Sequence, residues 1–488
     1  MLLLWAGAGT ICPRSHTCTA SDLYANSLVH ACAHAHPHSH RNTYFHSDNH
    51  SYRIDNAYPH RDGYPHRYFH RDGYPLAYPY LHGYPYPAAQ RNVDAISLPH
   101  HDSLPYQNIP SHRHAGGYHH HRQSKTLTFP PPMNTFLKDL ISAPGLSGHE
   151  APVRSLIAEK WETLSDEMHT TPIGSLHALK RGSAPEPRPK ILIATHMDAI
   201  GLMVTRLDGA YLHVTEIGGV DERVLPGQRV IVHGRRDLTG IVVQPADRLL
   251  PESLHGEPVP MEYLLVDTGL PAGELASLVH PGDLVSFAQP PLELGKHTLA
   301  GHSLDNRASV AALTYCLELL QGRDHAWDVW AVATVQEEET LGGALTSAFD
   351  LRPQVAIAVD VTFGDGPGSP DYLTFAIGEG IPFNWGPNVH RGVFKRLKET
   401  AEALEIPWHT EYAPRHSGTD GMALQIAADA VPTMVVSIPL RYMHTPVEMI
   451  STKDVNRVGR LLAEFIAALP ADWQPTLDDE NGDEQSND

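Results

Sequence analysis

The chain has 488 residues, with 56 Asp or Glu against 36 Lys or Arg, which gives a net charge of −20 at pH 7 with histidine neutral. This acidic balance argues against nucleic acid and anionic membrane as partners, because both select basic surfaces. No apolar run reaches the roughly 18 residues that a membrane-spanning helix needs.

Residues 1–132 differ in composition from the rest of the chain. They hold 19 of the 34 histidines, contain no Glu and repeat Gly-Tyr-Pro at a spacing of ten residues. Such a segment lacks the apolar periodicity that a hydrophobic core requires. Three interpretations stay open: a metal-storing histidine-rich tail, a disordered secreted spacer, and a start assigned too early. The last is favoured because no Met occurs between Met1 and Met133.

The cysteines also separate the two parts of the chain. Three of the 4 lie at positions 12, 18 and 32, so the remainder contains only Cys316. A single cysteine cannot form an internal disulfide, which fits a cytoplasmic protein.

From residue 133 the pattern alternates between strands and helices. Short apolar runs predict buried strands at 190–195, 329–335, 355–359 and 434–438, and helical periodicity appears at 151–164, 306–320, 392–404 and 455–469. Between 204 and 298, short alternating runs with turn signals predict an inserted β-rich domain. We therefore expect an α/β fold with a largely parallel sheet flanked by helices, formed by residues 133–203 and 299–472, and an acidic tail at 473–488.

Imidazole and acidic side chains follow the predicted strands at the points where those strands end. His196 and Asp198 follow the first strand, Glu337 and Glu338 the second, Asp360 the third and His444 the last, while Asp305 begins the helix after the insertion. In open α/β sheets, ligands bind outside the carboxyl ends of the strands, so we expect these side chains to meet in one site.

Two imidazoles and three carboxylates suit a pair of borderline divalent ions, Zn²⁺ or Co²⁺, with Mn²⁺ as a further alternative. Two ions about 3.5–4 Å apart need a bridging carboxylate, further ligands to each ion and a water between them. Each residue alone has an ordinary explanation, such as a helix cap or a solvated charge run. Their joint placement at strand ends favours a binuclear metal site.

Several longer motifs lie between residues 133 and 488. They are Gly145-Leu-Ser-Gly148, Thr195-His-Met-Asp-Ala-Ile-Gly-Leu-Met203, Ile217-Gly-Gly-Val220, Ser303-Leu-Asp-Asn-Arg307, Thr334-Val-Gln-Glu-Glu338, Val359-Asp-Val-Thr362, Gly418-Thr-Asp420 and Arg441-Tyr-Met-His444. This set resembles the tetrahedral (TET) and glutamyl aminopeptidases, family forty-two of the metallopeptidases, some members of which carry an endoglucanase label. The resemblance implies a zinc-exopeptidase-like fold and an enzyme that hydrolyses N-terminal residues from peptides.

The resemblance also implies a ligand set. His196 and Asp360 would hold one ion, Glu338 and His444 would hold the other, and Asp305 would bridge them. The inserted β domain would mediate dimer contacts, and dimers would build a dodecamer. Peptides would be the substrates.

Two further roles follow from the resemblance. Glu337 would be the general base, and Asp198 would bind the far nitrogen of His196. Where the family commonly has Glu-Glu-Val-Gly, this chain has Glu337-Glu338-Glu339-Thr340, a change that would alter the surroundings of the base.

Other functions remain as alternatives. The same type of scaffold serves metal-dependent amidases that remove acyl groups from amino acids. A non-catalytic metal-binding protein would depend on the histidine-rich segment. Endoglucanase activity is disfavoured, because a glycosidase needs a pair of carboxylates that are free of metal.

Overall fold

The computed structural model describes residues 131–370 and 372–477. The predictions for residues 1–130 and 478–488 lie outside the described residues. Within the described part, no helix is long and apolar enough to cross a membrane.

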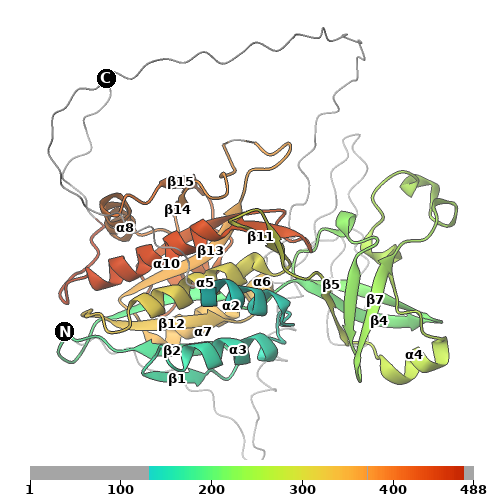
Figure 1. Cartoon of the computed structure of the whole chain (residues 1–488), viewed down its shortest axis with the longest axis horizontal. Helices are drawn as coiled ribbons and strands as arrows, with labels where there is room; N and C mark the ends of the chain where they lie inside the picture. The colour runs from blue at the N-terminus through green and yellow to red at the C-terminus, as the bar shows by residue number, and fades with distance from the viewer. Residues whose placement is uncertain (1–130, 371, 478–488) are drawn as a thin grey trace, which may run out of the picture. The chain divides into compact units, whose positions relative to one another are not determined.

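An 11-stranded sheet carries the α/β part of the chain (Figure 1). Its main path runs β1 (Glu167–Thr170), β2 (Leu176–Lys180), β12 (Asp328–Thr334), β3 (Lys190–His196), β13 (Val355–Phe363), β16 (Thr433–Arg441), β17 (Glu448–Ser451), β11 (Thr298–Gly301) and β10 (Leu292–Leu294). Off this path, β14 (Ile381–Trp385) pairs with β16 and with β15 (Trp408–Tyr412).

The sheet is parallel at its centre, and the side pair of β14 and β15 is parallel as well. Strands β12, β3, β13 and β16 pair in parallel, whereas β1 with β2, β2 with β12, β16 with β17, β17 with β11 and β11 with β10 are antiparallel. The expectation of a largely parallel sheet therefore holds for the centre and for β14 with β15, and it is wrong for the two ends of the main path, where the strands are antiparallel. Antiparallel neighbours such as β1 and β2 follow each other after a short turn, which a parallel pair cannot do.

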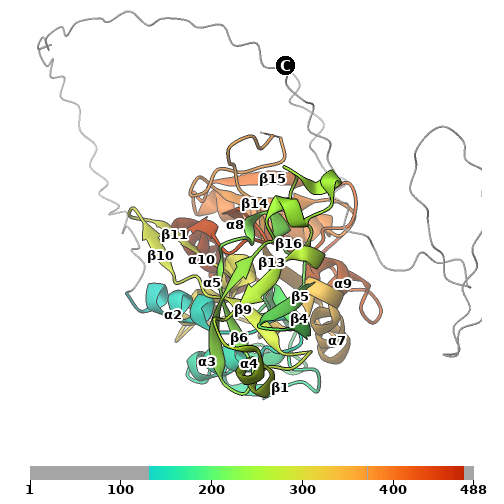
Figure 2. The ribbon, with the colours of Figure 1, turned by 90° about the vertical axis from the view of Figure 1, so that its right-hand side faces the viewer.

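Helices cover both faces of this sheet, as Figure 2 shows with α2 and α10 on one side and α7 and α9 on the other. The first face packs against α2 (Pro131–Ser142), α3 (Ala151–Trp161), α5 (Leu304–Leu319), α8 (Arg391–Ala403) and α10 (Thr452–Ala467). The second face packs against α7 (Gly342–Leu351) and α9 (Asp420–Ile426).

The central strands have apolar side chains on both faces of the sheet because helices cover both faces. In β3, Ile191 and Ile193 belong to the first core, whereas Leu192 and Ala194 belong to the second. Successive side chains in a strand point to opposite faces. A strand buried on both sides therefore has a continuous apolar run, which is the pattern that identified it.

The second part of the described chain is a closed barrel with the strand order β4-β5-β8-β7-β6-β9. Its strands are β4 (Gly201–Asp208), β5 (Tyr211–Ile217), β6 (Arg229–His233), β7 (Asp237–Val243), β8 (Leu265–Asp267) and β9 (Leu284–Phe287), and the short helix α4 (Ala272–Leu278) precedes β9. Alternate residues point inward, as Val230 and Val232 of β6 do. Strand β10, within the range expected for the insertion, pairs instead with β11 of the main sheet.

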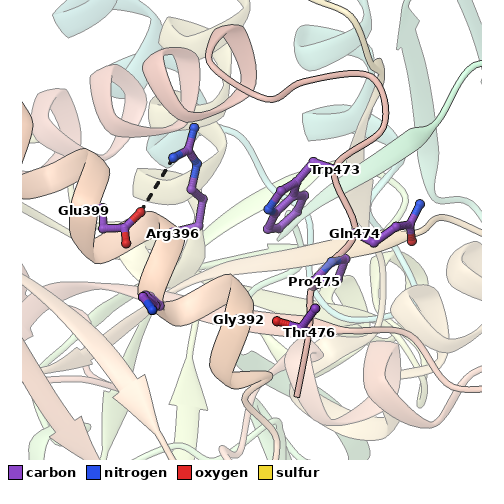
Figure 3. A pocket seen from close by; sticks show the side chains of 8 residues that line it. Gly392, Arg396, Glu399, Trp473, Gln474, Pro475 and Thr476 are labelled. Carbon is purple, nitrogen blue, oxygen red and sulfur yellow. Dashed lines mark ion pairs between the residues drawn. The ribbon is translucent and has the colours of Figure 1, made fainter. Parts of the chain in front are cut away.

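The segment after α10 returns along α8. Figure 3 shows a small pocket between them, lined by Gly392, Lys395, Arg396, Glu399, Trp473, Gln474, Pro475 and Thr476. Gly392 has no side chain, and a Cβ added there would lie 2.6 Å from the carbonyl oxygen of Thr476. The absence of a Cβ thus allows the returning segment to approach the first turn of α8.

Candidate active site

The sheet brings the predicted site residues to one region. His196 is the last residue of β3, and Asp360 lies within β13, its parallel neighbour. Glu337 and Glu338 open the short helix α6 (Glu337–Thr340), which follows β12. Asp305 is in the first turn of α5, and the loop between β16 and β17 contributes one further residue, His444.

Three of these side chains form a first triad, which consists of His196, Asp305 and Asp360. His196 Nε2 lies 3.1 Å from Asp305 Oδ1 and 3.6 Å from Asp360 Oδ1. One potential ligand atom from each residue lies within 4.8 Å of the other two, and all three residues are buried. The spacing is suitable for a single cation between them.

A second triad consists of Asp305, Glu338 and His444. His444 Nε2 lies 3.4 Å from Glu338 Oε2 and 3.5 Å from Asp305 Oδ2. Potential ligand atoms from the three residues again lie within 4.8 Å of one another. Asp305 therefore belongs to both triads, with one carboxylate oxygen near each histidine.

Glu337 lies beside the first triad without belonging to it. Its Oε2 is 3.7 Å from His196 Nε2, and the side chain is 9% exposed. Burial raises the pKa of the Glu337 carboxyl well above its usual range, and the nearby carboxylates of Asp360, Asp420 and Glu338 add to this shift. The group is thus a nearly buried carboxyl with an increased affinity for a proton.

Asp198 connects the ends of two strands. Its carboxylate accepts hydrogen bonds from Ser147 Oγ at 2.8 Å and from the backbone amides of Glu337 at 3.1 Å and Glu338 at 3.2 Å. His196 Nδ1 lies 3.3 Å from the backbone oxygen of Asp198 and 3.5 Å from its carboxylate. Asp198 therefore fixes both the start of α6 and the far side of the His196 ring.

Sequence reasoning gave no role to two further buried acids, Glu448 and Asp420. The two oxygens of Glu448 accept the backbone amides of Asp305 and His444, each at 3.1 Å. Asp420 accepts the hydroxyl of Thr334 at 2.5 Å. Asp420 stands in the quoted motif Gly418-Thr-Asp420, which could have directed attention to it, whereas Glu448 follows no recognised motif.

The charge of the cluster is unbalanced. Its carboxyl groups are Asp198, Asp305, Glu337, Glu338, Asp360, Asp420 and Glu448, against the two imidazoles. Burial opposes a charge on His196, but Glu337 and the hydrogen-bonded carboxylates outweigh it and raise the pKa of His196 well above its usual value. The pKa of His444 likewise reaches about 10 because Glu338 and Asp305 outweigh the effect of burial. Burial raises the pKa of Glu338 to about 8.

These observations fit bound divalent cations. Glu338 Oε1 is buried and has no hydrogen-bond partner among the described residues, although unpaired buried oxygens are costly. The nearby guanidinium of Arg307 donates to the backbone carbonyls of Leu140 and Met197 rather than to the carboxylates. Imidazole and carboxylate donors without thiolate suit borderline divalent metals.

The mixed α/β sheet and this cluster define a metal-dependent hydrolase. The chain belongs to the M42 glutamyl aminopeptidase family, whose model matches residues 174–461. The resemblance that the motifs indicated is thus confirmed. The protein is an enzyme of the aminopeptidase class, which hydrolyses peptide bonds, and its family depends on divalent metal.

Individual relatives agree with this assignment. The chain is 34% identical over 346 residues to a lysyl aminopeptidase of Pyrococcus furiosus, covering 70% of this chain and 98% of that protein. It resembles the solved structure of aminopeptidase APDkam598 from Desulfurococcus kamchatkensis with 31% identity and a TM-score of 0.65, covering 70% and 97% of the two chains. The TET1 peptidase of Pyrococcus horikoshii, which can assemble into a tetrahedron or a large octahedral shell, shows 26% identity and a TM-score of 0.60, covering 69% and 100%.

Proposed function

We propose that this enzyme removes N-terminal residues from peptides with the help of two divalent ions per subunit. The observation that carries the proposal is the position of Asp305, whose two oxygens face the histidines of two separate triads. His196 and Asp360 complete the first ion's ligand set, and Glu338 and His444 complete the second. Zn²⁺ and Co²⁺ suit these donors best, and Mn²⁺ is an alternative.

The bound ions would polarise the peptide carbonyl and lower the pKa of a water molecule that attacks it. The chain itself would move the proton. Glu337 lies close enough to the first triad to take a proton from the attacking water and to deliver it to the leaving amine.

Asp198 acts as a positioning residue in this proposal. By accepting the amides of Glu337 and Glu338, it holds the proposed base and one proposed ligand at a fixed separation. Its contacts with His196 Nδ1 orient the imidazole so that Nε2 faces the first triad.

We further propose that copies of the chain associate through the barrel, first as dimers and then as a dodecamer. The tetrahedral assembly described for the Pyrococcus horikoshii relative supports this. Molecular mass in solution, measured by light scattering, tests it directly. We also propose a zinc-exopeptidase-like architecture for the α/β part, formed by 133–203 and 299–472 around the insertion 204–298, and a cytoplasmic location.

Two substrates separate the proposed function from the amidase alternative. Purified enzyme loaded with Zn²⁺ or Co²⁺ should release the chromophore from an aminoacyl anilide and leave an N-acyl amino acid intact. A free α-amine is present only in the first substrate. Hydrolysis of the N-acyl amino acid alone would reject the aminopeptidase proposal in favour of an amidase.

A further inference from the structure

A second cluster of metal-binding side chains lies at the edge of the main sheet, on strands that contribute nothing to the active site. It consists of His169 on β1, His177 on β2 and Asp350 near the end of α7. His169 and His177 are register partners in the antiparallel pair β1 and β2. Their side chains therefore project from the same face of the sheet, the face that α7 covers.

The geometry of the cluster suits one ion. One ligand atom from each of the three residues lies within 4.8 Å of the other two. The imidazole rings of His169 and His177 meet edge to face with centroids 4.9 Å apart. Trp330 of β12 packs against both rings, with its ring centroid 6.1 Å from that of His169 and 6.2 Å from that of His177. This packing restricts the orientation of the two imidazoles.

Hydrogen bonding determines which nitrogen of His177 is available. The Ser347 hydroxyl donates its only proton to the carbonyl oxygen of Gly343 at 2.6 Å. At its 2.8 Å contact with His177 Nε2, Ser347 must therefore accept, so Nε2 carries the proton. The lone pair of His177 is consequently on Nδ1.

His177 Nδ1 is left without a hydrogen-bond partner among the described residues, although the side chain is fully buried. Burial lowers the pKa of His177 to about 4, and the neighbouring His169 adds to this effect. The ring is thus neutral at pH 7, with an unused lone pair. A histidine whose other nitrogen is hydrogen-bonded by a neighbouring group is the usual arrangement for a metal ligand.

We propose that His169, His177 and Asp350 bind a single divalent cation of the Zn²⁺ class, separate from the two ions of the active site. Two imidazoles and a carboxylate match the preferred ligands of Zn²⁺, and water completes the coordination on the exposed side. The ion connects the edge strand β1 and its neighbour β2 to α7. The site does not depend on the catalytic proposal, because no residue is shared.

Anomalous diffraction at the zinc edge locates the ion directly. Crystals of the full chain grown with Zn²⁺ should show a peak among His169, His177 and Asp350. His169→Ala removes an exposed ligand from an edge strand, so the fold survives and only this peak disappears. His409→Ala removes an exposed histidine from another edge strand, β15, and should leave the peak in place.

A solution measurement gives an independent answer. Zn²⁺ that binds the folded protein raises its thermal midpoint. Any Zn²⁺ bound by residues 1–132 contributes equally to every variant, so it does not affect the differences between variants. The midpoint should rise further with Zn²⁺ in wild type and His409→Ala than in His169→Ala. Ser347→Ala keeps all three ligands but frees the His177 ring, so it should need about 10–100-fold more Zn²⁺ for the same shift.

Three results would overturn the proposal. The first is the absence of a peak at the cluster in wild-type crystals that contain Zn²⁺ in the active site. The second is a peak that persists in His169→Ala. The third is an equal thermal shift in wild type and His169→Ala.

Discussion

The two carboxylate oxygens of Asp305 face two different histidines, one in each triad. We predict that Asp305→Ala loses more metal than any other single ligand variant. Asp360→Ala and His444→Ala should each lose about one ion relative to wild type, whereas Asp305→Ala should lose both. Metal analysis of purified proteins measures these differences, and any metal held by residues 1–132 cancels in the comparison. Wild-type metal content in Asp305→Ala would rule out a bridging role.

Replacement of Glu337 should lower the rate of the catalysed reaction without removing the bound metal. Glu337→Gln keeps the shape of the side chain but cannot accept a proton, so kcat should fall by about 10²–10⁴-fold while both ions remain. The matched control is Glu339→Gln, which changes an exposed acid two positions away that accepts the amide of Gly218. The control should retain most of its activity. A Glu337→Gln enzyme with wild-type kcat would refute the assignment.

Site residues that follow strong local patterns can be predicted from the sequence alone. His196, Asp360 and Glu338 are placed by apolar strands, so their neighbourhood is predictable from where those strands end. Glu448 is different, because its contact with the amide of Asp305 joins residues 143 positions apart. Only the folded chain brings such a pair together.

Among the elements, α5 and α10 make an unusually close contact at Gly459. A Cβ added there would lie 2.6 Å from the carbonyl oxygen of Ala312 and 2.8 Å from Cδ1 of Tyr315, both on α5. We predict that Gly459→Ala lowers the free energy of unfolding by about 1–3 kcal/mol, as is typical of overpacked cores.

The control for this prediction is Gly273→Ala in α4, where the added Cβ meets no atom within 4 Å. Alanine is favoured over glycine inside a helix by roughly 0.5–1 kcal/mol, so this variant should be unchanged or more stable. Urea unfolding of both variants provides the comparison. Equal stability of the two variants would show that α10 can move away from α5 without cost.

Some helices and strands can be predicted from the sequence pattern, and others cannot. The central strands have continuous apolar runs, and α8 and α10 each have one apolar face. The structure places these elements, together with α3 and α5, within a few residues of the predicted limits. The edge strands β1 and β10 are short and mostly exposed, so they have no apolar run. For this reason the sequence pattern does not predict these two edge strands.

For the whole molecule, we predict that a chain beginning at Met133 folds and hydrolyses aminoacyl substrates as well as the full chain does. Every proposed ligand, both main cores and the barrel lie beyond this residue. Activity at equal metal loading and the thermal midpoint are the measurements. Activity below a tenth of that of the full chain would show that residues 1–132 supply metal to the site or shape its entrance.

The two sheets differ in their edges. Among the described residues, the main sheet ends in edge strands with unpaired backbone groups, such as β1 and β10, whereas the barrel is closed and has no edge strand. In the proposed assembly, copies would meet through the barrel, so they could not join their sheets by backbone hydrogen bonds, a kind of pairing that tolerates most sequences. They must recognise one another by the shape and charge of side chains. A single substitution on the outer barrel wall can consequently change how many copies assemble while the fold and the catalytic chemistry of each copy stay intact.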